Sequence, residues 1–187
     1  MRLFVALDVP QETRERLASL IRQFAKVCRG ARWVRAEGVH VTLKFIGETD
    51  EAKLPVIKAK LAEVSSAGAI EIAFQQFGFF PNERRPRVFW VGMQAGPELA
   101  ELAKQIDAKL QPVGIPHAEK EFRPHLTLAR FNSTEGLPKL QDVIKRLATQ
   151  EFGSTTAREF HLYQSKLKQG GAEYTRLASF AFARGTE

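Results

Sequence analysis

One short string of residues occurs twice in this chain, once in each half. His40–Leu43 and His125–Leu128 both read histidine, apolar residue, threonine, leucine. Each string lies in a segment where polar and apolar residues alternate, which is typical of a strand with one buried face. Because residues i and i+2 of a strand point to the same side, each copy should present an imidazole beside a hydroxyl. The repeat predicts two related strands whose histidines can face one another across one cleft.

Around these strands, segments of helical and strand periodicity alternate. Residues 2–9 are predicted to form a strand, followed by a helix over 11–28 in which Leu17, Ile21 and Phe24 recur near the helical period. Further strands are expected at 39–45, 70–80, 87–94, 125–131, 158–167 and 173–183, and further helices at 51–66, 97–111 and 135–149. This intermixing of helices and strands indicates an α+β or α/β domain.

The cycle of helices and strands begins again at Gly96, which indicates an internal duplication. No low-complexity segment or linker separates two independent domains. We therefore expect a single bilobal domain over residues 1–187, with lobes of approximately 1–95 and 96–187. The lobes should pack as one body and could exchange terminal strands.

The charge of the chain favours a polyanionic partner. With 28 Lys and Arg against 21 Asp and Glu, the net charge is +7, and such a surface attracts nucleic acid. Ordinary surface lysines and arginines explain the same excess equally well. No apolar stretch reaches the ~20 residues needed to cross a bilayer. The lone Cys28 cannot form an internal disulfide, so nothing indicates an oxidising compartment, and we expect a cytoplasmic protein.

Two histidines facing one phosphorus atom would suit the hydrolysis of a phosphodiester. One imidazole can take a proton from the attacking water while the other gives a proton to the departing oxygen, because the reference pKa of histidine is about 6.5. Thr42 and Thr127 would then donate hydrogen bonds to the non-bridging oxygens. A lone histidine on a strand is most often structural, but two equivalent copies are harder to ascribe to chance. The scheme requires no metal, and a zinc site would need three or four ligands that a single cysteine on a helix does not supply.

Four stretches of the chain carry a family resemblance. They lie in the expected order and span most of the sequence: Arg2–Leu7, His40–Gly47, Arg87–Gly92 and Phe122–Arg130. On these residues the sequence resembles the 2H phosphoesterase superfamily, specifically the bacterial and archaeal LigT-like RNA 2′,3′-cyclic phosphodiesterases of the 2′–5′ RNA ligase family. The whole pattern is far more specific than either tetrapeptide.

The resemblance implies both a fold and an activity. The fold would be α+β and bilobal, with two pseudo-twofold-related lobes whose mostly antiparallel sheets line a central groove and whose helices lie outside. The activity would be hydrolysis of RNA or oligonucleotide 2′,3′-cyclic phosphate ends to 2′-phosphomonoesters. His40 would donate a proton to the 3′-oxygen, and His125 would accept one from water. A weak reverse reaction would join RNA through a 2′–5′ linkage. We expect no cofactor, no metal and no membrane partner, and a monomeric protein.

Two basic residues near the motifs have alternative interpretations. By the resemblance Arg130 contacts a phosphate or nucleotide, yet a regular strand would place it opposite His125, and a surface ion pair is the alternative. Lys44 should share a face with His40 and could reach a flanking phosphate, although a solvated lysine is the simpler interpretation.

Other residues are assigned by position alone. Arg84, Arg85 and Arg87 beside an exposed turn could steer an RNA backbone, or could simply be solvated. His117 and His161 lie outside any motif and are interpreted as structural. Five aromatic residues should be mostly core, although one of them at the groove could stack on the terminal base: Phe77, Phe79, Phe80, Phe89 and Trp90.

Two further functions stay open at this level. An RNA- or nucleotide-binding 2H module could keep the groove without turnover, although the intact histidine pair argues against it. A 2H phosphodiesterase could also act on another small cyclic phosphate or on 2′–5′ oligoadenylate. Assays on a small panel of phosphodiesters, with identification of the product isomer, would separate these possibilities.

Overall fold

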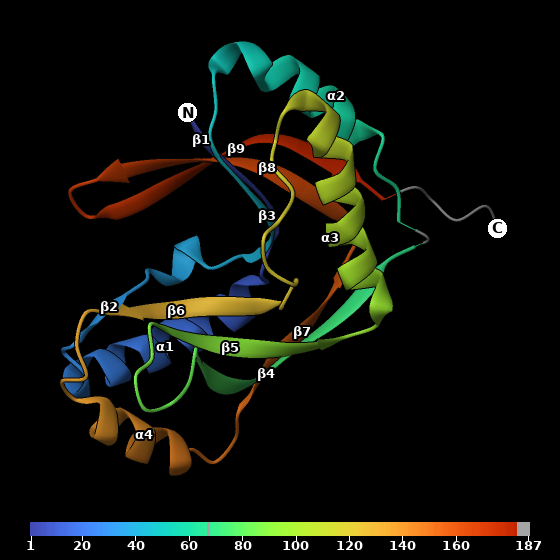
Figure 1. Ribbon diagram of the computed structural model, residues 1–187. Helices are drawn as coiled ribbons and strands as arrows, with labels where there is room; N and C mark the ends of the chain where they lie inside the picture. The colour runs from blue at the N-terminus through green and yellow to red at the C-terminus, as the bar shows by residue number, and fades with distance from the viewer. Residues whose placement is uncertain (67, 183–187) are drawn as a thin grey trace.

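The computed structural model describes residues 1–66 and 68–182, and the strands of these residues form two antiparallel sheets (Figure 1). Sheet A has the order β3-β1-β8-β9 and sheet B the order β2-β6-β5-β4-β7. Sheet A consists of β1 (Arg2–Leu7), β3 (Val41–Glu48), β8 (Glu159–Lys168) and β9 (Gly171–Ala181). Sheet B consists of β2 (Ala31–Trp33), β4 (Ile70–Phe80), β5 (Val88–Ala95), β6 (His125–Phe131) and β7 (Glu151–Ala157). The α+β prediction is confirmed.

The helices lie on the outer sides of the two sheets (Figure 1). Against sheet B lies α1 (Gln11–Val27), with α4 (Leu137–Lys145) packed on it, while α2 (Leu54–Ala62) and α3 (Pro97–Leu110) contact strands of sheet A. Leu17, Ile21 and Phe24 are buried at helical spacing, which explains why α1 forms where it was predicted. The 3₁₀ helices are η1 (Ala36–Gly38), η2 (Glu51–Lys53) and η3 (Gln111–Val113). Within the described residues, no helix combines the length and apolar character of a membrane span.

Several element boundaries differ from the prediction. Strands β2 and β7 were not expected, because β2 has only three residues and β7 is rich in serine and threonine. The helix predicted over 51–66 is the 3₁₀ turn η2 followed by the shorter α2, and the helix predicted over 135–149 shortens to α4. The strand expected at 173–183 is β9, and its predicted last residue, Ala183, lies outside the described residues.

Each sheet takes strands from both halves of the chain. In sheet A, β1 and β3 come from the first half and β8 and β9 from the second, and sheet B is mixed in the same way. The sheets therefore do not coincide with lobes of 1–95 and 96–187. The halves are mixed in sheet A because β1 pairs with β3 along one edge and with the C-terminal strand β8 along the other. This exchange ties both sheets into one continuous hydrophobic core.

Strand β3 contains a β-bulge at the leucine of its motif. Thr42 pairs with Ala6 of β1, but the next paired position joins Lys44 to Val5. Leu43 therefore has no partner on β1. An extra residue of this kind bends a strand and reverses the alternation of side chains beyond it.

Strand β6 has a bulge at the equivalent residue. Thr127 pairs with Trp90 of β5, and the next paired position joins Ala129 to Phe89, so that Leu128 is the extra residue. Both His-x-Thr-Leu strings thus end in the same irregularity. The sequence repeat is a repeat of strand geometry as well as of residue type.

The bulges decide where the residues after each motif point. Lys44 and Ala129, four residues after the respective histidines, are buried on the side of the core, whereas Phe45 and Arg130, one residue further on, are exposed. Phe45 pairs with Phe4, and Arg130 pairs with Val88. Cross-strand partners lie on the same face of a sheet, so Phe45 and Arg130 return to the faces that carry the histidine motifs. We call these the histidine faces of the two sheets.

The prediction that Lys44 shares a face with His40 is wrong. Its side chain is 5% exposed, and its ammonium group donates hydrogen bonds to Asp107 of α3 and to the carbonyl oxygen of Pro116, the latter at 2.6 Å. Burial alone would raise the pKa of Asp107, but hydrogen bonds from Lys44 and from the backbone N–H of Ala118 hold it below its ordinary value. Lys44 anchors β3 to α3 and does not point toward the motif histidines.

Candidate active site

His40 lies immediately before β3 and is held by the backbone that leads into the strand. Its Nδ1 is 2.7 Å from the carbonyl oxygen of Gly38, and its side chain is nearly buried. Because a carbonyl oxygen only accepts hydrogen bonds, Nδ1 must carry a proton. Nε2 is then an acceptor in the neutral ring and a donor in the charged ring.

His125 is the first residue of β6 and is held in the same way. Its Nδ1 is 2.6 Å from the carbonyl oxygen of Arg123, which again lies two residues earlier in the chain. Within the described residues, neither Nε2 of the two motif histidines takes part in a hydrogen bond. Strands β3 and β6, which carry or directly follow the motif histidines, belong to different sheets but contact one another.

Aromatic rings surround His40 on the histidine face of sheet A. Its ring centroid lies 4.8 Å from that of Tyr163, 5.2 Å from Tyr174 and 5.7 Å from Phe4. Burial among these rings disfavours the imidazolium and lowers the pKa of His40, an effect that the hydrogen bond to Gly38 partly opposes.

His125 has a similar but more open environment on sheet B. Its ring centroid lies 5.1 Å from Phe80, in an edge-on contact, and 6.5 Å from Trp90. Burial lowers the pKa of His125, and the positive charge of Arg130 lowers it further. Of the five aromatic residues singled out from the sequence, Phe80 and Trp90 therefore lie at the candidate site, whereas Phe89 is fully buried with Phe77 and Phe79 packed on it.

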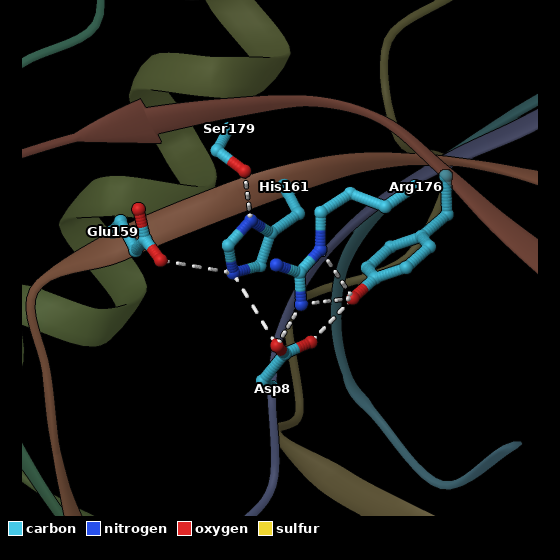
Figure 2. A network of polar contacts seen from close by, with 6 residues as sticks. Asp8, Glu159, His161, Arg176 and Ser179 are labelled. Atoms are coloured by element: carbon cyan, nitrogen blue, oxygen red, sulfur yellow. Dashed lines mark hydrogen bonds and ion pairs between the residues drawn. The ribbon is translucent and has the colours of Figure 1, made fainter. Parts of the chain in front are cut away.

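A network of polar side chains supports the rings beside His40 (Figure 2). Asp8, at the end of β1, accepts hydrogen bonds from the Tyr163 hydroxyl and from Arg176. His161 lies with Nε2 3.6 Å from Asp8 and with Nδ1 2.9 Å from the Ser179 hydroxyl. Burial and the hydrogen bond to Asp8 raise the pKa of Tyr163 to about 12. The phenol therefore remains a neutral donor that fixes the ring against His40, and His161 belongs to this supporting network.

The motif threonines have hydroxyl groups that are free to bind a ligand. Thr42 and Thr127 are half-buried on the two histidine faces, each two residues beyond its histidine. In residues 1–66 and 68–182 neither hydroxyl makes a hydrogen bond to another group of the protein. Together with two Nε2 atoms, these hydroxyls supply the proton acceptors and donors that a phosphate group could use.

The remaining predicted residues lie elsewhere. Arg84 and Arg85 are in an exposed turn, where both backbone N–H groups donate to the side chain of Asn82 at 3.0 Å. His117 is 74% exposed and contacts Asp107. Among the described residues, no three His, Cys, Asp or Glu side chains are grouped so that they could hold a metal ion.

Sequence reasoning missed several residues that contact or face the motif histidines. Tyr163 and Tyr174 reach His40 only because β8 pairs with β1 and β9 pairs with β8, an arrangement without a local sequence signal. Asp8 directly follows β1 and accepts a hydrogen bond from Tyr163. Arg32 lies in the three-residue strand β2, directly opposite Arg130. Its one signal in the sequence was its charge.

The fold is shared with several solved structures. TT0787 of Thermus thermophilus is 29% identical, with a TM-score of 0.80 and coverage of 97% of this chain and 98% of that chain. LigT of E. coli, solved in complex with 3′-AMP, is 28% identical with a TM-score of 0.77, and 98% of each chain is covered. Together with the two His-x-Thr motifs, this fold defines a 2H phosphoesterase.

The family follows from sequence comparison. Residues 9–169 match the family model described as the 2′-5′ RNA ligase superfamily, and the chain belongs to that superfamily. Two similar proteins are named RNA 2′,3′-cyclic phosphodiesterase. The protein of Archaeoglobus fulgidus is 36% identical over 180 residues, which cover 96% of this chain and 99% of the relative. The protein of Methanocaldococcus jannaschii is 37% identical over 174 residues, which cover 93% and 96%.

Proposed function

We propose that this protein hydrolyses 2′,3′-cyclic phosphate ends of RNA to 2′-phosphomonoesters, with His40 and His125 as general acid and general base. The observation that carries the proposal is the matched setting of the two imidazoles. Each donates through Nδ1 to the carbonyl two residues earlier, each has an Nε2 without a hydrogen-bond partner in the described residues, and the strands β3 and β6 contact one another. The names and superfamily of the related proteins support the same substrate.

The proposed reaction is a single displacement at phosphorus. Neutral His125 takes a proton from water through Nε2, and the water oxygen forms a bond to phosphorus. The bond from phosphorus to the 3′-oxygen breaks, and that oxygen receives the Nε2 proton of charged His40. The products are a 3′-hydroxyl and a 2′-phosphomonoester, and solvent exchange restores the two imidazoles. The hydroxyls of Thr42 and Thr127 would stabilise charge on the non-bridging oxygens.

The same proton transfers could also serve ligation. If a 5′-hydroxyl of RNA replaces water as the nucleophile, His125 can take its proton and His40 can protonate the departing 3′-oxygen. The product would be a 2′–5′ linkage. Ligation therefore needs no residue beyond those of hydrolysis.

The product isomer tests the assignment of the acid. A short oligonucleotide ending in a 2′,3′-cyclic phosphate should be converted to the 2′-phosphate, with the same rate in the presence and absence of EDTA. Chromatography against 2′- and 3′-phosphate standards distinguishes the isomers. A 3′-phosphate product would contradict the role of His40, and loss of turnover in EDTA would contradict a metal-free mechanism. Cyclic mononucleotides and 2′–5′ oligoadenylate, assayed in parallel, show whether another phosphodiester is preferred.

The pH dependence of kcat/KM should reflect the lowered pKa values of both histidines. The base His125 must be neutral and the acid His40 charged, and kcat/KM reports these groups in the free enzyme. Because burial lowers both pKa values, the maximum of kcat/KM should lie below pH 6.5, the reference pKa of histidine. Above it, kcat/KM should fall about tenfold per pH unit as His40 loses its proton.

The profile of kcat should differ in a defined way. A bound phosphate places negative charge beside His40 and favours its charged form. The alkaline limb of kcat should therefore lie at higher pH than that of kcat/KM. Steady-state rates from pH 4.5 to 8.5 measure both limbs. Coincident alkaline limbs would show that no phosphate binds close to His40.

A further inference from the structure

The histidine face of sheet A carries a small apolar cluster of its own. Ala6 pairs with Thr42 of the motif, and Phe4 pairs with Tyr163. The side chains of Phe4, Ala6 and Tyr163 are buried together, separate from the main hydrophobic core. The rings of Phe4 and Tyr163 are stacked at 5.4 Å, and both lie against the imidazole of His40. This cluster therefore packs the motif histidine rather than the core of the protein.

Asp8 holds the polar end of this cluster (Figure 2). Its carboxylate accepts hydrogen bonds from the Tyr163 hydroxyl and from the guanidinium group of Arg176. Arg176 also donates to the Tyr163 hydroxyl at 3.2 Å, so that the three groups form a closed set of hydrogen bonds. The phenol is thus held at its hydroxyl by Asp8 and Arg176 and at its ring by Phe4, which restrains it from turning away from His40.

Asp8 also brings a negative charge close to His40. Burial alone would raise the pKa of Asp8, but the hydrogen bond from Tyr163 and the nearby positive charges hold it below its ordinary value, so the carboxylate is charged at neutral pH. Burial has the largest effect on the pKa of His40 and lowers it. Among the charged groups, Asp8 raises this pKa, whereas Arg14 of α1 and His161 of β8 lower it. The other titratable groups against the imidazole are the phenols of Tyr163 and Tyr174.

We propose that Asp8 positions the general acid. It holds the ring of Tyr163 against His40, and it places a negative charge beside an imidazole that must be charged to donate its proton. This proposal rests on the proposed function. Neither Asp8 nor Tyr163 touches the substrate in this scheme. Positioning of the acid matters because a misplacement of about 1 Å can cost about 100-fold in rate.

Two variants separate the hold on the ring from the charge. Asp8→Asn removes the charge but keeps an oxygen that can accept from Tyr163, so it should move the alkaline limb of kcat/KM to lower pH and leave KM unchanged. Tyr163→Phe keeps the ring and the charge of Asp8, which Arg176 still binds. It should lower kcat by about two- to tenfold, the value of one hydrogen bond, without moving the alkaline limb. A wild-type kcat in Tyr163→Phe would overturn the positioning role.

The His40→Asn background distinguishes positioning from damage to the fold. At a pH above the alkaline limb of the wild type, Asp8→Asn should lower the rate of the wild type but cause little further loss in His40→Asn, because Asp8 acts through His40. The same fold loss in both backgrounds would overturn the proposal. Asp142→Asn on the outer helix α4 makes the same change of charge at an exposed position, and it should behave like the wild type in each assay.

NMR titration tests the effect of Asp8 without turnover. In Asp8→Asn the pKa of His40 should be lower than in the wild type, while the pKa of His125 on sheet B should not change. The signal of His40 is identified by its loss in His40→Asn. An unchanged pKa of His40, or an equal shift of both histidines, would overturn the proposal. If the wild type hydrolyses no cyclic phosphate, the proposed function is wrong, and this titration still decides whether Asp8 acts on His40.

Discussion

Replacement of either motif histidine by asparagine should lower kcat for cyclic phosphate hydrolysis by about 10²- to 10⁴-fold, the usual contribution of one general acid or base. Asparagine is chosen because its amide nitrogen takes the place of Nδ1 and can still donate to the carbonyl of Gly38 or Arg123. The substitution thus preserves the local hydrogen bond and removes only Nε2. Single-turnover rates at saturating substrate measure the chemical step.

The pH profiles of these variants assign the two roles. His40→Asn should lose the alkaline limb of kcat/KM, and His125→Asn should lose the acidic limb. The double variant should be little slower than the slower single variant, because residues that act as a unit are not additive. His117→Asn removes an exposed imidazole whose contacts are with Asp107 and Gln111, so this variant is the control and should retain full activity. Single variants that retain wild-type rates would contradict the two-histidine mechanism.

The sequence predicted the elements that have a strong local pattern. Strand β6 begins and ends at the predicted residues, and α1 differs from its prediction by one residue at its end. The same alternation that predicted β6 also placed His125 and Thr127 correctly on one face. These assignments succeeded because period and polarity are properties of neighbouring residues.

The features that were missed depend on pairing between distant strands. A bulge is defined by the partner strand, so nothing in His40–Leu43 alone shows that Leu43 lacks a partner on β1. From that single irregularity follow the burial of Lys44 and the exposure of Phe45. The bulge at Leu128 explains Arg130 in the same way. A regular strand would place Arg130 on the face opposite His125, but the extra residue returns it to the face of His125.

The two bulges also make the two histidine faces chemically different. The fifth residue after each histidine returns to the histidine face, as Phe45 in sheet A and as Arg130 in sheet B. The phenyl ring of Phe45 is 64% exposed and offers an apolar surface, whereas Arg130 offers a positive charge. Equivalent backbone positions thus provide different chemistry on the two histidine faces.

Removal of the buried ammonium group of Lys44 should destabilise the protein strongly. In Lys44→Met the carboxylate of Asp107 remains buried without its partner, and breaking such a pair costs about 3–5 kcal/mol. For a chain of this length the melting temperature should fall by about 6–20 °C. Urea unfolding at pH 7, followed by circular dichroism, measures the free energy of unfolding.

The cause of this loss can be isolated with two further variants. Lys44→Met combined with Asp107→Asn removes the negative charge at position 107 but keeps an oxygen that accepts from the N–H of Ala118. The double variant should therefore recover part of the lost stability. The exposed pair of Arg16 and Glu12 is the matched control, and Arg16→Met should cost about 1 kcal/mol or less. Below its melting temperature, Lys44→Met should keep the KM of the wild type, since the ammonium group binds Asp107 and not the substrate. A higher KM with an unchanged free energy of unfolding would instead place Lys44 at the phosphate.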